Sequence, residues 1–193
     1  MQQTIPLIIL DRDGVINEDS DAYIKSPSEW IPVPHSPEAI ALLNSFGIKI
    51  AVATNQSGLA RGFYSEATLD LIHYTMQETL AKVNATIDSI FYCPHGPDDN
   101  CICRKPKPGL LKQISQFYQC QLKDIPFVGD SMRDLDAAAA VGCLPVLVKT
   151  GKGKHTWEKY ASQLPSGTLV FDNLMAFAQY YTSKYNEKSA PLV

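Results

Sequence analysis

The sequence predicts a doubly wound α/β domain, in which helices cover both faces of a parallel sheet. Short and nearly continuous apolar runs alternate with stretches of helical spacing along the 193 residues. Strands of this kind are typically buried on both faces of a parallel sheet. The chain is also 45% hydrophobic and 19% charged, which is ordinary for a single globular domain. In this architecture the active site lies beyond the carboxyl ends of the strands.

The first strand and the first helix are indicated by their residue types. The apolar run "LIILD" at 7–11 predicts a buried strand. Ser36 and Pro37 predict a helix start, because Ser suits the N-cap and Pro suits the first turn. The helix is expected to end just before Gly47, since glycine readily terminates helices. A second strand is expected at 48–55.

The middle of the chain continues the alternation. A long helix is expected over 65–83, because apolar residues recur there on one helical face. The residues on that face are Leu69, Ile72, Met76 and Leu80. A third strand at 87–93 and a helix at 108–118 are expected to follow.

The last part of the chain completes the pattern. We expect strands at 125–130, 144–149 and 168–171, and a helix at 134–142. Asp172 is expected to cap a last helix that runs to about Tyr181. The residues that follow are polar, so a loose tail is expected over 184–193. The sequence has no internal repeat and no low-complexity linker. We therefore expect one domain over residues 1–183.

Carboxylates follow two of the expected strands. Asp11 and Asp13 come directly after the first strand, and Asp130 comes after the fourth. Because the carboxyl ends of parallel strands meet at one edge of the sheet, these oxygen ligands are expected to converge into a site suited to Mg²⁺. A carboxylate can also attack phosphorus, and a second one nearby can act as general acid and base. The alternative is a solvated turn, since Asp and Gly are common turn residues.

Polar groups also follow the second strand. Thr54 offers a hydroxyl group, and the turn formed by Asn55, Gln56 and Ser57 offers backbone N–H groups. Both kinds of donor suit the oxygens of a bound phosphate. Taken alone, Thr54 would be interpreted as an ordinary β-branched strand residue. The "TNQSG" context favours phosphate binding instead.

A basic pair, Arg104 and Lys105, lies beyond the third strand. Lys105 can neutralise the charge that develops on a phosphoryl group, and Arg104 can bind a second anion through two parallel hydrogen bonds. Standing alone, the pair would be interpreted as part of a solvated basic loop. Together with the other strand ends, it indicates an anion site.

Three cysteines and a histidine gather between the third strand and this basic pair. Cys93, His95, Cys101 and Cys103 form a set that is typical of a closed, structural zinc site. Because all four ligand positions are filled, no place is left for water or substrate. The alternatives are free cysteines that cluster by chance, and a disulfide, which a reducing cytoplasm disfavours. No role is assigned to the remaining cysteines and histidines, which are His35, His73, Cys120, Cys143 and His155.

Four motifs in chain order, "DRDGVIN", "ATNQSG", "CRKPKPG" and "VGDSMRDLDAA", resemble those of the haloacid dehalogenase superfamily of phosphatases. Within it they are most similar to the heptose-bisphosphate and histidinol-phosphate phosphatase group, which carries the same spaced Cys/His cluster. The resemblance covers residues 5–153, approximately. It implies a Rossmann-like sheet of the haloacid dehalogenase type, without a full cap domain and with a zinc-binding loop.

The resemblance also implies roles for the strand-end residues. Asp11 would be the nucleophile that becomes an aspartyl-phosphate, and Asp13 the general acid and base. Mg²⁺ would be held by the Asp11 carboxylate, the Asp13 backbone carbonyl and Asp130. Thr54 and Lys105 would contact the phosphoryl group that is transferred.

Further implied roles concern the rest of the substrate. Arg104 would recognise a second phosphate. The segment 17–30, "NEDSDAYIKSPSEW", would replace a cap domain, and Tyr23 is its candidate substrate contact. Many relatives carry Lys after the fourth-motif Asp, where this chain has Ser131. This difference leaves the metal ligand intact but removes a possible contact to substrate.

The leading hypothesis is an Mg²⁺-dependent phosphatase for a small phosphorylated sugar of the lipopolysaccharide-core heptose pathway, acting as a cytoplasmic monomer. A histidinol-phosphate phosphatase and a receiver-type phosphoacceptor domain remain alternatives. A zinc finger that binds nucleic acid is disfavoured by the net charge of −3 and the single short basic patch "RKPKP". No apolar run approaches the roughly 20 residues of a membrane span, so a membrane is not expected as a partner. Nucleic acid is not expected as a partner either, because of the net charge.

Overall fold

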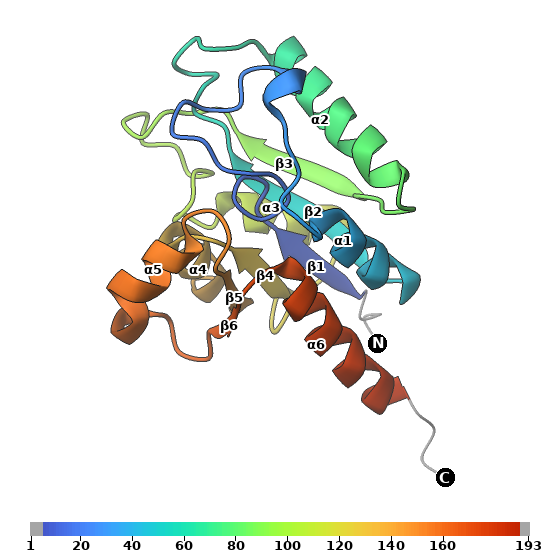
Figure 1. The fold of residues 1–193 in the computed structure, drawn as a ribbon. Coiled ribbons are helices and arrows are strands. Elements are labelled where there is room, and N and C mark those ends of the chain that lie inside the picture. The colour runs from blue at the N-terminus through green and yellow to red at the C-terminus, as the bar shows by residue number, and fades with distance from the viewer. Residues whose placement is uncertain (1–5, 190–193) are drawn as a thin grey trace.

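A single sheet of parallel strands forms the centre of the protein (Figure 1). The computed structural model describes the backbone of residues 6–189 and the side chains of residues 6–184. Within this range the sheet has six strands in the order β3-β2-β1-β4-β5-β6. The strands are β1 (Leu7–Leu10), β2 (Lys49–Asn55), β3 (Ser89–Cys93), β4 (Pro126–Gly129), β5 (Leu144–Val148) and β6 (Leu169–Phe171). All neighbouring strands pair in parallel, which confirms the predicted fold class.

Helices cover both faces of the sheet (Figure 1). They are α1 (Ser36–Ser45), α2 (Glu66–Ala81), α3 (Gly109–Tyr118), α4 (Met132–Ala139), α5 (Gly153–Tyr160) and α6 (Leu174–Ser189), with short 3-10 turns at Pro27–Glu29 and Ala161–Gln163. Helices α1, α2 and α6 pack with Ile8 and Leu10 on one face. Helices α3 and α4 pack with Leu7 and Ile9 on the other. Strand β1 is a continuous apolar run because it is buried on both faces of the sheet.

Two helices differ from the sequence prediction. Helix α5 was not predicted, and His155, which was expected in a loop, lies within it. Its buried residues are Gly153 and Thr156, so its sequence carries no apolar stripe that could signal a helix. Helix α6 continues to Ser189 instead of ending near Tyr181. The expected loose tail is therefore helical up to Ser189, and residues 190–193 lie outside the described residues.

Two predicted helix caps also differ. The N-cap of α1 is His35, which has a φ of 65°, and the hydroxyl of Ser36 instead donates to the carbonyl of Val15 at 2.6 Å. At the start of α6, the carboxamide oxygen of Asn173, rather than Asp172, accepts from the backbone N–H of Ala176 at 2.9 Å. In both cases neighbouring polar residues compete for one cap, and sequence alone does not rank them.

The strand order places the site. Strand β1 lies between β2 and β4, and the chain leaves β1 toward one side of the sheet and returns on the other. A crevice forms at the carboxyl ends where the order reverses in this way. The residues that follow β1, β2 and β4 therefore meet. Among the described residues, the helices are too short or too polar to cross a bilayer.

Candidate active site

Three carboxylates meet at the carboxyl ends of β1 and β4. Oxygen atoms of Asp11, Asp130 and Asp134 all lie within 4.8 Å of one another. Asp11 follows β1, and its backbone N–H donates to Val128 of β4 at 2.8 Å, which fixes its place at the switch point. Asp130 follows β4, and Asp134 lies in the first turn of α4. Asp11 and Asp130 were predicted as metal ligands from the sequence, whereas Asp134, which lies in the fourth motif, was given no role.

Lys105 lies among these carboxylates and is almost completely buried. Its Nζ is 2.8 Å from Asp11 Oδ1 and 2.7 Å from Asp134 Oδ1, and it donates to the carbonyl of Ala53 at 2.7 Å. The side chain of Asn55 holds the Lys105 backbone from both sides, accepting from its N–H and donating to its carbonyl, each at 3.1 Å. Lys105 is therefore fixed in place as the cation of the cluster.

The electrostatics of the cluster favour a further cation. Burial raises the pKa of Asp11 to about 7, helped by the charge of Asp134 and opposed by that of Lys105. Burial and the charges of Asp134 and Asp11 raise the pKa of Asp130 well above its usual range. Buried, mutually repelling carboxylate oxygens are the donor set that Mg²⁺ prefers. The residues present therefore fit a magnesium ion.

Two glycines allow the backbone to pass close to Asp130. A Cβ atom on Gly14, whose φ is +81°, would clash with Asp130 Oδ2. A Cβ atom on Gly151 would clash with the same oxygen. Asp130 Oδ2 also accepts the backbone N–H of Lys152 at 2.8 Å. The loops after β1 and β5 thus enclose this carboxylate, and side chains at either glycine would displace it.

Asp13 does not point into the carboxylate cluster, because Arg12 holds it. Arg12 donates from Nε and Nη2 to Asp13 at distances from 2.9 to 3.1 Å. Asn17 donates to Asp13 Oδ1 at 2.8 Å, and Gln56 donates to Asp13 Oδ2 at 3.0 Å. Burial alone would raise the pKa of Asp13, but the charge of Arg12 and these hydrogen bonds together lower it. The carboxyl group of Asp13 is therefore held in a fixed orientation.

Gln56 links the residues at the end of β2 to Asp13. Its amide nitrogen donates to Thr54 Oγ1 at 2.9 Å as well as to Asp13. Its amide oxygen accepts from the hydroxyl of Tyr64 at 2.6 Å and from Arg12 at 3.2 Å. The side chains of Gln56 and Asn55 are thus engaged within the protein. Direct contacts of these two residues with substrate stay a prediction.

A cavity of about 230 Å³ opens above this cluster. It brings together all the residues that the sequence analysis selected for phosphate chemistry and substrate binding. These are Asp11, Asp13, Tyr23, Thr54, Asn55, Gln56, Ser57, Arg104, Lys105 and Asp130. The volume and the charged walls suit a small anionic ligand.

The cavity walls carry two arginines, Arg104 and Arg133. Nη1 of Arg104 donates to the backbone carbonyl of His95 at 3.2 Å. Burial, followed by the positive charge of Arg133, lowers the pKa of Arg104. Two neighbouring guanidinium groups repel each other, and an anion between them would relieve that repulsion. Arg133 was not selected from the sequence.

The segment after β1 is tied down beside the cavity. Lys152 Nζ lies 3.0 Å from a carboxylate oxygen of Asp19 and 3.0 Å from one of Asp21. The ring of Tyr23 lies 5.1 Å from that of Phe63, centroid to centroid. The segment that was expected to replace a cap domain is therefore placed next to the site by charge and by ring packing.

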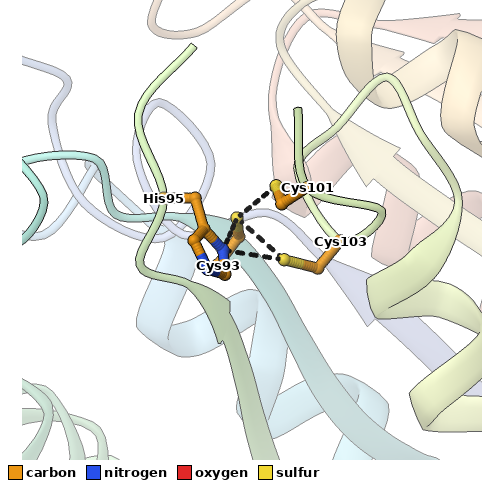
Figure 2. Close-up of side chains that lie close together, drawn as sticks. All are labelled: Cys93, His95, Cys101 and Cys103. Atoms are coloured by element: carbon orange, nitrogen blue, oxygen red, sulfur yellow. Dashed lines mark hydrogen bonds between the residues drawn. The ribbon is translucent and has the colours of Figure 1, made fainter. Parts of the chain in front are cut away.

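The Cys/His cluster is assembled beside β3 (Figure 2). Cys93 Sγ lies 3.6 Å from Cys101 Sγ, 3.1 Å from Cys103 Sγ and 3.6 Å from His95 Nδ1, which is itself 3.3 Å from Cys103 Sγ. Thiolates on a tetrahedral zinc ion, with bonds of about 2.3 Å, are about 3.8 Å apart. The four distances given are slightly shorter than that, and all four ligand atoms lie within 4.8 Å of one another, so this set of ligands fits a structural zinc ion.

Comparison with known proteins identifies the family. The HAD-hydrolase-like family matches residues 102–177. A D-glycero-β-D-manno-heptose-1,7-bisphosphate 7-phosphatase of Pseudomonas aeruginosa is 59% identical over 172 residues, which are 89% of this chain and 95% of that protein. The chain belongs to this family of heptose-bisphosphate phosphatases.

Solved structures of the heptose-bisphosphate phosphatase family have the same fold. The crystal structure of D,D-heptose 1,7-bisphosphate phosphatase from Bordetella bronchiseptica, complexed with magnesium and phosphate, matches with a TM-score of 0.91 and 51% identity over 93% of this chain and 99% of that one. The enzyme from Burkholderia thailandensis matches with a TM-score of 0.73 and 44% identity over 92% of this chain and 98% of that one.

Ser131, which directly follows Asp130, has a structural task in this chain. Its hydroxyl donates to Asp134 Oδ2 at 2.6 Å, and its backbone N–H donates to the same oxygen at 3.1 Å. The two residues form the capping box of α4. The S-x-x-D spacing was the sequence signal that could have identified Asp134.

Proposed function

We propose that this protein is an Mg²⁺-dependent phosphatase that removes the 7-phosphate of D-glycero-β-D-manno-heptose 1,7-bisphosphate. The observation that carries the proposal is the buried Asp11–Lys105 pair, 2.8 Å apart, at the base of a cavity whose walls carry two arginines. A relative that is 59% identical bears the name of this activity. A nucleophile, a cation beside it and a second anion site are the parts that a bisphosphate phosphatase needs.

In the first step, a carboxylate oxygen of Asp11 attacks the phosphorus of the 7-phosphate. The new bond joins Asp11 to phosphorus, and the bond from phosphorus to the heptose 7-oxygen breaks. Asp13 carries the proton that it took from water in the preceding turnover and gives it to that oxygen. Lys105 favours the ionised form of Asp11, which burial opposes. Mg²⁺, held by the Asp11 carboxylate, the Asp13 backbone carbonyl and Asp130, supplies positive charge that offsets the charge on the phosphoryl group.

In the second step, water attacks the phosphorus of the aspartyl-phosphate. Asp13 takes a proton from this water, the bond between phosphorus and the Asp11 oxygen breaks, and inorganic phosphate leaves. The charge of Arg12 and the hydrogen bonds to Asp13 lower its pKa against the effect of burial, which favours release of this proton to the next leaving group. The hydrogen bonds from Arg12, Asn17 and Gln56 keep it oriented for this exchange.

The second phosphate distinguishes the proposed substrate from histidinol phosphate. Arg104 and Arg133 both line the cavity, and each can bind phosphate through two hydrogen bonds. The amine of histidinol would instead be repelled by two positive charges. The cationic wall therefore favours the bisphosphate.

The test compares kcat/KM for the heptose bisphosphate and for histidinol phosphate in the wild type, Arg133→Met and Arg61→Met. Arg61 is exposed and outside the cavity, so it is a matched control. We expect the wild type to prefer the bisphosphate, and Arg133→Met to raise its KM by roughly tenfold, the loss of one charge-assisted contact. A wild type that prefers histidinol phosphate would overturn the proposed substrate.

We further propose that residues 1–183 form a single phosphatase domain that acts as a monomer in the cytoplasm. One chain supplies Asp11, Lys105 and both arginines, so the proposed chemistry needs no residue from a second copy. The zinc ligands must stay reduced, which a cytoplasmic setting ensures. Light scattering on the purified protein tests the monomer, and a dimer that loses activity on dilution would contradict it.

A further inference from the structure

The guanidinium of Arg12 is one of the largest fully buried groups in the described part of the chain. One edge of it, Nε and Nη2, donates to Asp13, and Nη2 also donates to Gln56 Oε1 at 3.2 Å. The orientation of Asp13 therefore depends on the orientation of Arg12. The contact made by the remaining nitrogen, Nη1, therefore decides how firmly the plane of the Arg12 guanidinium is fixed.

Nη1 of Arg12 lies 3.3 Å from Nε2 of His73, a residue of α2 that is 61 positions away in sequence. A guanidinium can donate but cannot accept, so Nε2 must be the acceptor and the ring proton must sit on Nδ1. His73 is 8% exposed. Burial, aided by the charge of Arg12, lowers the pKa of His73 to about 4, so the ring is neutral and able to accept.

We propose that His73 is a positioning residue for phosphoryl transfer: by accepting from Nη1 it fixes the plane of Arg12, and Arg12 in turn fixes Asp13 for proton transfer. This inference rests on the proposed function, because it assigns Asp13 the transferred proton. His73 touches neither the carboxylate cluster nor the cavity wall. Within residues 6–184, it is the acceptor that the structure provides for Nη1.

If His73 acts through Asp13, the effect of replacing His73 on kcat/KM should depend on the leaving group of the substrate. A heptose 7-oxygen leaves as an alkoxide and needs a proton, whereas p-nitrophenolate leaves as a stable anion and needs none. The parameter kcat/KM reports the steps up to and including transfer to Asp11, so it isolates this proton from the later hydrolysis. Loss of His73 should therefore lower kcat/KM for the heptose bisphosphate much more than for p-nitrophenyl phosphate.

The experiment uses three substitutions of His73 and one control. The carboxamide of His73→Gln can reach Nη1 of Arg12, the shorter His73→Asn cannot, and His73→Leu cannot accept at all. Met76→Leu, a volume-conserving change one turn further along the same helix face, controls for altered packing of α2. All variants are purified with zinc and assayed with Mg²⁺ on both substrates.

We expect His73→Leu and His73→Asn to lower kcat/KM for the heptose bisphosphate about tenfold, part of the 10²–10⁴-fold contribution of general acid–base catalysis. The same variants should change kcat/KM for p-nitrophenyl phosphate less than about threefold, because no proton is needed there. His73→Gln and Met76→Leu should resemble the wild type on both substrates.

Equal losses on both substrates would overturn the inference, as would a His73→Gln variant that is as slow as His73→Asn. If His73→Leu does not fold, the difference in kcat/KM between His73→Gln and His73→Asn tests the inference. A wild type that is inactive on the heptose bisphosphate would count against the proposed function instead. The same comparison with any other alkyl phosphate that the wild type hydrolyses would then decide the role of His73.

Discussion

The substitution Lys105→Met removes the cation from the carboxylate cluster while keeping a side chain of similar length. In the wild type, Nζ of Lys105 lies 2.8 Å from Asp11 and 2.7 Å from Asp134, and the lysine side chain is 2% exposed. Met keeps the apolar contacts of the stem, so the change is mainly electrostatic. It leaves the carboxylates of Asp11 and Asp134, which lie close to Asp130, without the lysine that pairs with both of them.

The expected loss of stability follows from the burial of Lys105 and its two carboxylate partners, Asp11 and Asp134. Removing one partner of a buried ion pair costs roughly 3–5 kcal/mol, because a desolvated charge is left behind. A domain of this size loses about 2–4 °C of Tm for each kcal/mol, so the melting temperature should fall by about 10 °C. Saturating Mg²⁺ should restore part of the loss, because a ligand that binds the folded state stabilises it.

The pH dependence of this effect has a definite sign. In the wild type, burial would raise the pKa of Asp134, but the charge of Lys105 lowers it overall. Without Lys105, burial leaves the pKa of Asp134 raised, so the folded state binds a proton more tightly than the unfolded state. Stability then increases as the pH falls. The destabilisation by Lys105→Met should therefore be smaller at pH 6 than at pH 8.

Urea unfolding of the zinc-loaded protein in Mg²⁺-free buffer measures these differences. The control is Lys49→Met, which removes a lysine that is 48% exposed and 3.5 Å from Asp88. That surface pair should contribute no more than about 1 kcal/mol. A loss for Lys105→Met as small as that of the control, or one that grows toward pH 6, would refute the electrostatic account of the cluster.

Three further changes test other parts of the site. Asp11→Asn should abolish phosphate release, while calorimetry should still detect substrate binding. Substantial turnover by this variant would show that Asp11 is not the nucleophile. Gly14→Ala should weaken activation by Mg²⁺ by at least about tenfold, because its Cβ would clash with Asp130 Oδ2, a carboxylate oxygen of the magnesium site. Gly47→Ala is the matched control, because Gly47 has a φ of +70° and a Cβ atom there would have nothing within 4 Å. Equal Mg²⁺ activation of the Gly14→Ala and Gly47→Ala variants would contradict the predicted clash with Asp130. Cys101→Ala should lower zinc content, melting temperature and turnover together; unchanged stability and turnover after zinc loss would show that the cluster does not brace the site.

The residues at the strand ends could be predicted because parallel strands bring their carboxyl ends to one edge. Asp11, Thr54 and Asp130 are far apart in sequence, yet each directly follows a buried apolar run. The alternation of such runs with helical stretches was enough to predict that they share a cavity. The cluster around Cys93 could be predicted for a different reason, since its ligands are close neighbours in sequence.

The orientation of side chains could not be predicted in the same way. The sequence places Gln56 beside a phosphate site, but only the packed structure shows its amide bonded to Asp13 and Thr54. The contact between Arg12 and His73 joins a loop to the buried face of α2, and no local pattern encodes it. Helix α5 was missed because it packs through Gly153 and Thr156 rather than an apolar stripe.

The zinc site and the phosphate site are connected through the backbone. Cys103 directly precedes Arg104 and Lys105, and Arg104 donates to the carbonyl of the ligand His95 at 3.2 Å. Ordering this loop therefore orders the cations that face the substrate. This geometry gives the cluster a reason to lie beside an active site without taking part in the chemistry.

The central claim is that the protein cleaves the 7-phosphate and leaves the other phosphate in place. Phosphorus NMR of a reaction with the heptose 1,7-bisphosphate and Mg²⁺ tests it most directly. The account predicts that the resonance of the 7-phosphate ester disappears as inorganic phosphate grows, while that of the anomeric 1-phosphate persists. Loss of the anomeric phosphate, or an unchanged spectrum with zinc-loaded and folded protein, would contradict it.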